Sequence, residues 1–359
     1  MVFTADRIIL LIFGITFVLG GIDFLLGNKF GCGKKIHEGL QTFAPLFLTM
    51  AGFIVLTPVI VRIISPIVVP LFQKMGMDPG VFPGIILACD NGAYTLSQEL
   101  GKAPQAAGFG GILLGSMLGA NVVSIPLVLQ LLAKGDQKIF FKGFIFGIST
   151  VPIGLIAGGL AAGYPLKFIL SQIPLLVILS VVTVILFLTV PDFLIRFLAV
   201  FAKSMEVVAI IGLMIAVFLY LSGFSLPGIV SILEPVKVVG SIVIVLPGVY
   251  VFTDLLSRGL KNILPLIGRS LKINNIAIIG FLTTIANAVP TMLMMKDMDD
   301  RGKFLNCAFL VSGAYMLGDH LAFCGAVVPE MIVPLIVTKL TAGVTAVIAA
   351  LIYLRKRSI

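Results

Sequence analysis

Long apolar stretches follow one another along almost the whole chain, and they constrain its fold more than any other feature. A transmembrane helix needs about 20 mostly apolar residues, because it rises about 1.5 Å per residue and the hydrocarbon core is about 30 Å thick. About eleven stretches meet this requirement: 7–27, 40–62, 79–97, 106–131, 139–163, 166–189, 199–222, 236–257, 274–295, 303–325 and 331–354. The sequence therefore predicts an all-α polytopic membrane protein with about eleven transmembrane helices.

The composition excludes an ordinary soluble enzyme. Of the 359 residues, 59% are hydrophobic and 11% charged, and the mean hydropathy is +1.17. Soluble domains are roughly 45–50% apolar and about 25% charged. No linker, low-complexity run or soluble segment interrupts the series, so we expect one transmembrane transport domain over 1–359.

Basic residues gather in the loops at 133–142 and 257–272 and in the tail at 355–357. Such loops beside apolar spans are typical of membrane insertion. The net charge of +9 therefore points to a lipid environment and not to nucleic acid. A strict count of eleven spans puts both loops on the opposite side from the tail, so either one span is re-entrant or the count is off by one.

Several spans contain proline, which removes a backbone donor and clashes with the preceding turn of a helix. Broken helices are tolerated at membrane depth only where protein or water satisfies the freed backbone groups, and secondary transporters build their binding sites from them. We therefore expect several interrupted helices. The layout of the polar segments also suggests two related halves, about 1–165 and 199–354, although identity between them is at chance level.

Ionisable residues inside the spans are the sharpest sign of function, because a charge at a helix centre costs roughly 2.5–3.5 kcal/mol on insertion scales. Asp90 lies within one span beside Asn91, and Asp319 and His320 lie deep in another. Residues four apart share a helix face, which predicts Tyr94 beside Asp90 and Tyr315 beside Asp319. A carboxylate with an aromatic wall suits a small organic cation. The structural alternative is a buried ion pair in which Lys339 neutralises one of the carboxylates.

Other chemistries are poorly supported. The chain has no G-x-x-x-x-G-K-[ST] motif for ATP and no zinc spacing around His37 or His320. Intramembrane aspartyl proteases carry Tyr-Asp and Gly-x-Gly-Asp motifs, which Asp90 and Asp319 match only by half. We therefore predict that the protein is not an enzyme and uses no metal or organic cofactor.

Six ordered blocks of the sequence resemble the ethanolamine permease family, the EutH-type proteins of bacterial ethanolamine utilisation. They are Leu87–Asp90, Lys272–Ala277, Ala286-Asn287 with Pro290, Asp299–Lys303, Asn306–Phe309 and Leu317–Leu321. The resemblance implies uptake of ethanolamine through the bacterial cytoplasmic membrane by a multi-pass protein. It assigns no binding residue and no coupling ion, and it leaves open whether the protein forms a homo-oligomer.

The expected site therefore rests on the physical argument. Asp90 or Asp319 would take the ammonium group of ethanolamine or a similar small cation, and His320 is a candidate to titrate in function. Amide or hydroxyl groups would bind the alcohol, and two tyrosines would form the walls; these residues are Asn91, Ser116, Asn287, Tyr94 and Tyr315. We expect a permease, either a secondary carrier or a facilitator. The alternatives are a non-transporting membrane sensor or scaffold of the ethanolamine machinery and an intramembrane aspartyl protease.

Overall fold

The computed structural model describes residues 4–133, 135–260 and 262–356, and in these ranges the chain is helical with no strand. Seven helical segments are long and apolar enough to cross a membrane. They are α1 (Ala5–Leu25), α2 (Cys32–Gln41) running into α3 (Phe43–Lys74), α7 (Gln137–Ser149) running into α8 (Val151–Ala161), α9 (Leu166–Thr189), α10 (Pro191–Ser222), α11 (Leu233–Leu260), and η5 (Pro329–Met331) running into α17 (Ile332–Lys356). The expected all-α polytopic architecture is confirmed, but the described residues contain seven such spans where about eleven transmembrane helices were expected.

Two further stretches reach the length of a crossing through two shorter helices in series. One joins the π-helical segment η3 (Ala107–Gly119) to α6 (Ala120–Leu131) without a break. The other joins α15 (Asp300–Gly313) to α16 (Asp319–Val327) through an unwound segment at 314–318. The expected interruption of helices is confirmed here, because the helix breaks directly before Asp319.

The stretch at 79–100 is a hairpin and does not cross as one helix. It consists of η1 (Pro79–Val81), α4 (Pro83–Ile86), the irregular turn η2 (Cys89–Ala93) and α5 (Tyr94–Leu100). The carboxylate of Asp78 accepts hydrogen bonds from the backbone N–H groups of Gly80, at 2.8 Å, and of Ala103, at 2.7 Å. Both ends of this first hairpin therefore meet at Asp78, and Gly92, with φ +97°, helps to turn the chain at the tip.

The stretch at 275–294 also doubles back. It consists of α13 (Asn275–Ala286) and α14 (Ala288–Met294). The helix α12 (Leu264–Leu271) precedes this stretch, and the short η4 (Met295–Asp297) follows it. The Thr291 hydroxyl donates to the Gly280 carbonyl at 3.0 Å and lies 2.7 Å from the Thr283 hydroxyl, so α13 and α14 run antiparallel. The tip of this second hairpin is Asn287, where the helix breaks.

The two hairpins enter from opposite ends of the molecule. The first hairpin leads at Ala103 into the start of η3, whereas Asp136, just beyond the other end of α6, is salt-bridged to Lys303 at 2.7 Å. Lys303 lies near the start of α15, beside the base of the second hairpin, where Asn274 donates its backbone N–H to Asp299 at 3.2 Å. This inverted relation is common in transporters, while the division into halves at 1–165 and 199–354 stays a prediction.

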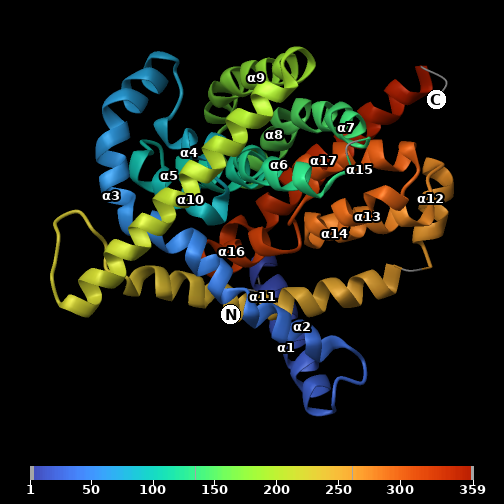
Figure 1. The fold of residues 1–359 in the computed structure, drawn as a ribbon, viewed down its shortest axis with the longest axis horizontal. Helices are drawn as coiled ribbons and strands as arrows, with labels where there is room; N and C mark the ends of the chain where they lie inside the picture. Colours follow the sequence, from blue (N-terminus) through green and yellow to red (C-terminus); the bar gives the residue numbers. More distant parts are fainter. Residues whose placement is uncertain (1–3, 134, 261, 357–359) are drawn as a thin grey trace.

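The hairpins also explain the distribution of basic loops. Arg258 donates to the Phe30 carbonyl at 2.6 Å and Arg301 to the Leu271 carbonyl at 2.7 Å. The loop after α1, the stretch between α11 and α13 and the loop before α15 therefore meet at one end, here called the basic end. In Figure 1, α12 and the C-terminal end of α17 lie on the same side of the view. Because the stretches at 79–97 and 274–295 are re-entrant, the loops at 133–142 and 257–272 face the same side as the end of α17. The positive-inside rule predicts that this end faces the cytoplasm.

Candidate functional site

A pocket of about 230 Å³, here called the central pocket, lies where the tip of the first hairpin meets α3, α6 and the start of α16. Five of the residues predicted for the site line it together, although they come from segments far apart in the sequence. They are Asp90, Asn91, Tyr315, Asp319 and His320. The remaining lining residues are Pro45, Leu46, Thr49, Ala88, Ala120 and Ser124.

Asp90 offers the pocket an unpaired carboxylate oxygen. The residue is 8% exposed, and its Oδ1 is buried without a hydrogen-bond partner. The nearest basic group is Nε2 of His320 at 3.9 Å, too far for a hydrogen bond. A buried polar atom without a partner costs about 1–3 kcal/mol or more when it is charged, so this oxygen is placed for a ligand that donates.

Asp319 begins α16 on the far side of the pocket and already has a partner. The Tyr250 hydroxyl of α11 donates to its Oδ1 at 3.1 Å. Sequence reasoning missed Tyr250, because α11 reads as a continuous apolar span. The available signal was a lone tyrosine inside that span, since a buried tyrosine hydroxyl usually finds a partner.

The unwound segment before Asp319 is held by the second hairpin and by α11. Backbone N–H groups of Tyr315 and Leu317 donate to the carbonyls of Thr284, at 3.1 Å, and Ile285, at 2.8 Å. The Thr253 hydroxyl donates to the Leu317 carbonyl at 3.0 Å. Protein groups thus satisfy the backbone freed by the break, as membrane burial requires. Tyr315, with φ +60°, lies against the His320 ring at a centroid distance of 5.4 Å.

Lys339 of α17 does not pair directly with either carboxylate. Its Nζ donates to the Ser116 carbonyl at 2.6 Å and lies 3.2 Å from Nδ1 of His320, with no salt bridge to Asp90 or Asp319 within 4.0 Å. With Lys339 as an ammonium, which only donates, Nδ1 of His320 accepts and Nε2 carries the proton on the side of Asp90. The expected alternative of a direct ion pair is therefore not what the structure contains.

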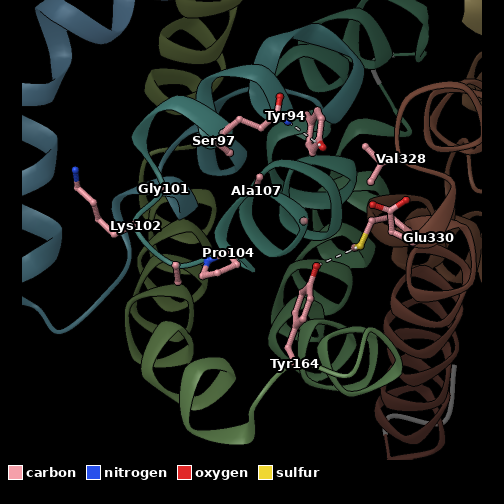
Figure 2. Close-up of a pocket in the computed structure, with 13 residues that line it drawn as sticks. Tyr94, Ser97, Gly101, Lys102, Pro104, Ala107, Tyr164, Val328 and Glu330 are labelled. Carbon is pink, nitrogen blue, oxygen red and sulfur yellow. Dashed lines mark hydrogen bonds between the residues drawn. The ribbon is translucent and has the colours of Figure 1, made fainter.

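Three predicted residues lie away from the central pocket. The Ser116 side chain is buried and donates to the Leu113 carbonyl at 3.0 Å, so its contribution near the site is its backbone carbonyl. Tyr94 lines a different cavity of about 440 Å³, here called the outer pocket (Figure 2). Asn287 accepts from the Val289 N–H at 2.9 Å and lines a third cavity of about 290 Å³, here called the hairpin pocket.

The hairpin pocket adjoins the central pocket through one contact. Tyr250 lines the hairpin pocket, and its hydroxyl reaches Asp319 of the central pocket. The hairpin pocket also contains Glu38, Asp254 and Ser257, and it lies near the basic end where Arg258 contacts the loop after α1. The Tyr250–Asp319 hydrogen bond therefore lies between the central pocket and the hairpin pocket, which adjoins the basic end.

Potential metal ligands are also present. Ligand atoms of Cys89, Asp90 and His320 all lie within 4.8 Å of one another and are buried. However, Lys339 lies beside His320, and as an ammonium it would place a positive charge where a metal ion would need an electron-rich site. The expectation that the protein uses no metal stays a prediction.

Comparison with known proteins matches residues 5–353 to the family described as ethanolamine utilisation protein, EutH. A probable ethanolamine permease EutH of Listeria monocytogenes is 40% identical over 98% of this chain and 95% of the relative. A probable ethanolamine permease EutH of Salmonella typhimurium is 38% identical over 91% of this chain and 86% of the relative. The uncharacterized protein YxeR of Bacillus subtilis is 36% identical over 97% of this chain and 94% of the relative. No solved structure matches.

Proposed function

Because the chain belongs to the EutH family of ethanolamine utilisation proteins, we propose that it is a permease that moves protonated ethanolamine across the cytoplasmic membrane. The family is named for a permease and not for an enzyme, so the alternative of an aspartyl protease falls away. The protein is a multi-pass protein of the bacterial cell membrane. The proposal extends to a binding site and a route for the cation.

The observation that carries the site is the unpartnered Oδ1 of Asp90 in the central pocket. Ethanolamine is mostly an ammonium ion at neutral pH, and a cation crosses hydrocarbon only where protein replaces its hydration. Asp90 would accept from the ammonium group, with Asp319 as the second carboxylate. Tyr315 would supply an aromatic wall, and the side-chain amide of Asn91 would bind the alcohol.

The same arrangement supports a carrier with alternating access. The ammonium group and the Tyr250 hydroxyl compete for the carboxylate of Asp319, so binding of substrate weakens the contact that separates the central and hairpin pockets. The two hairpins, entering from opposite ends, are the elements able to open the site to either side in turn. We therefore favour a secondary carrier over a facilitating channel, with the coupling ion left open.

Uptake of labelled ethanolamine into proteoliposomes containing only this protein tests the proposal. Vesicles with the wild-type chain should fill faster than empty vesicles, and Asp90→Asn should reduce the rate by at least tenfold. Glu206→Gln serves as the control, because Glu206 is an exposed carboxylate on α10 that is paired with Lys203 at 2.9 Å. Absence of flux from folded wild-type protein would instead favour the non-transporting sensor or scaffold.

A further inference from the structure

The outer pocket lies at the end of the molecule opposite to the basic end. Three loops meet there: the one after the first hairpin, with Lys102 and Ala103, the α8–α9 loop with Tyr164, and the segment at 328–331. Asp78 ties two neighbouring elements together at this end, since its backbone N–H donates to Gln172 of α9 at 2.9 Å while its carboxylate holds Ala103. The pocket therefore faces the side of the membrane away from the cytoplasm.

Glu330 gives this pocket a negative charge that no side chain neutralises. It is exposed on the pocket wall, and within the described residues it forms no salt bridge shorter than 4.0 Å. Lys102 is the one basic residue of the lining, and Figure 2 shows its side chain directed away from Glu330. The carboxylate is thus free to attract a cation from water.

Two tyrosines flank Glu330 in the same view (Figure 2). The Tyr164 hydroxyl donates to Sδ of Met331 at 3.3 Å, and the Tyr94 hydroxyl accepts from Gln98 at 3.1 Å, so both rings are held in place. Burial, followed by the charge of Glu330, raises the pKa of Tyr164 to about 12. Tyr164 therefore stays a neutral phenol, whose ring face attracts cations.

The first hairpin and α16 link the outer pocket to the central pocket. Tyr94 lies just after the hairpin turn that carries Asp90, and its ring packs edge-on against Phe323 at a centroid distance of 6.0 Å. Phe323 belongs to α16, the helix that Asp319 begins. This contact therefore joins the wall of the outer pocket to the helix that carries Asp319.

We propose that the outer pocket is a second binding site for small organic ammonium ions, in which Glu330 holds the ammonium group between the rings of Tyr94 and Tyr164. The proposal rests on the permease function above and adds the step by which the cation is collected from outside. A carboxylate in a concave surface raises the local concentration of cations and their rate of arrival. Because the site is open to water, it binds the ammonium ion weakly. Weak binding lets the ion leave the outer pocket for the central pocket.

The kinetic test compares Glu330→Gln with Glu99→Gln in cells or oriented vesicles that take up ethanolamine from outside. Glu99 is an exposed carboxylate of the same hairpin that does not line the pocket, which makes it a matched control. Glu330→Gln should raise KM about 3- to 10-fold and leave kcat nearly unchanged. An unchanged KM in a transporting Glu330→Gln variant would overturn the site while leaving the permease function intact.

A second measurement needs no transport. The four native cysteines are buried, so Ala103→Cys places one accessible thiol in the outer pocket. A cationic aminoethyl methanethiosulfonate should modify it faster than a neutral methyl methanethiosulfonate, and adding Glu330→Gln should reduce that rate ratio about 3- to 10-fold. Adding Glu99→Gln should leave the ratio unchanged, and a ratio that Glu330→Gln does not change would overturn the proposal.

Discussion

The Nζ atom of Lys339 lies 3.2 Å from Nδ1 of His320 and donates its other hydrogen bond to the Ser116 carbonyl at 2.6 Å. As an ammonium, Lys339 would fix the orientation of the imidazole that faces Asp90. It would also place a positive charge near the pocket proposed for the substrate cation. Under the proposed function, Lys339 would therefore weaken substrate binding and help a carrier to release the cation.

Replacing Lys339 by glutamine tests this effect, because glutamine keeps a donor and removes the charge. Two unit charges about 8–16 Å apart interact by about 1–2 kcal/mol at an effective dielectric of about 20. Without the charge of Lys339, ethanolamine should therefore bind about 5- to 30-fold more tightly. Equilibrium binding to the purified variant measures the change. Lys203→Gln, at an exposed position of α10, should bind as the wild type does; weaker binding by Lys339→Gln would contradict the account.

Tyr250→Phe removes the hydroxyl that donates to Asp319 but keeps the ring. Hydrogen bonds to charged groups contribute about 1.5–3 kcal/mol, so Asp319 becomes available to the ammonium and the barrier toward the hairpin pocket weakens. We expect KM for ethanolamine to fall and preloaded vesicles to leak ethanolamine faster. Tyr220→Phe, at an exposed tyrosine of α10, is the matched control. Efflux from Tyr250→Phe at the wild-type rate would argue against a barrier at this position.

Gly92→Ala tests the turn of the first hairpin. Gly92 has φ +97°, which alanine rarely adopts, and an added Cβ would lie 3.0 Å from Cβ of Phe53. Such strain costs about 1–3 kcal/mol, so Tm in detergent should fall and transport should be lost with the geometry of Asp90. Gly21→Ala in α1 is the comparison, because its Cβ would meet nothing within 4 Å. If both variants melt at the same temperature as the wild type, the turn is not strained in the way described.

The sequence identified the membrane architecture and the two carboxylates for the same reason. Apolar stretches longer than about 20 residues have few other stable solutions, and charges such as Asp90 and Asp319 inside them stand out because they are costly. Whether a broken stretch crosses or doubles back depends on distant contacts. In the two hairpins, the backbone N–H of Ala103 donates to Asp78 and the Thr291 hydroxyl donates to Gly280, and no local sequence pattern predicts these contacts.

The misplaced site residues have local causes. The expectation that Tyr94 faces the same pocket as Asp90 assumes a regular helix, but Asn91 and Gly92 depart from helical geometry, so Tyr94 turns to the outer pocket. Tyr315 reaches the central pocket through an unwound segment and not through the helical spacing that suggested it. Ser116 is turned inward on η3, where its hydroxyl bonds its own helix.

Equilibrium binding of labelled ethanolamine to the purified protein tests the central claim most directly, namely that the unpaired carboxylate of Asp90 holds the ammonium group. Asp90→Asn should bind at least 30-fold more weakly, since removing one partner of a buried charge pair costs about 2–5 kcal/mol. Ethylene glycol, which lacks the charge, should not compete, and Glu206→Gln should bind normally. Wild-type affinity in Asp90→Asn, or equal competition by ethylene glycol, would contradict the account.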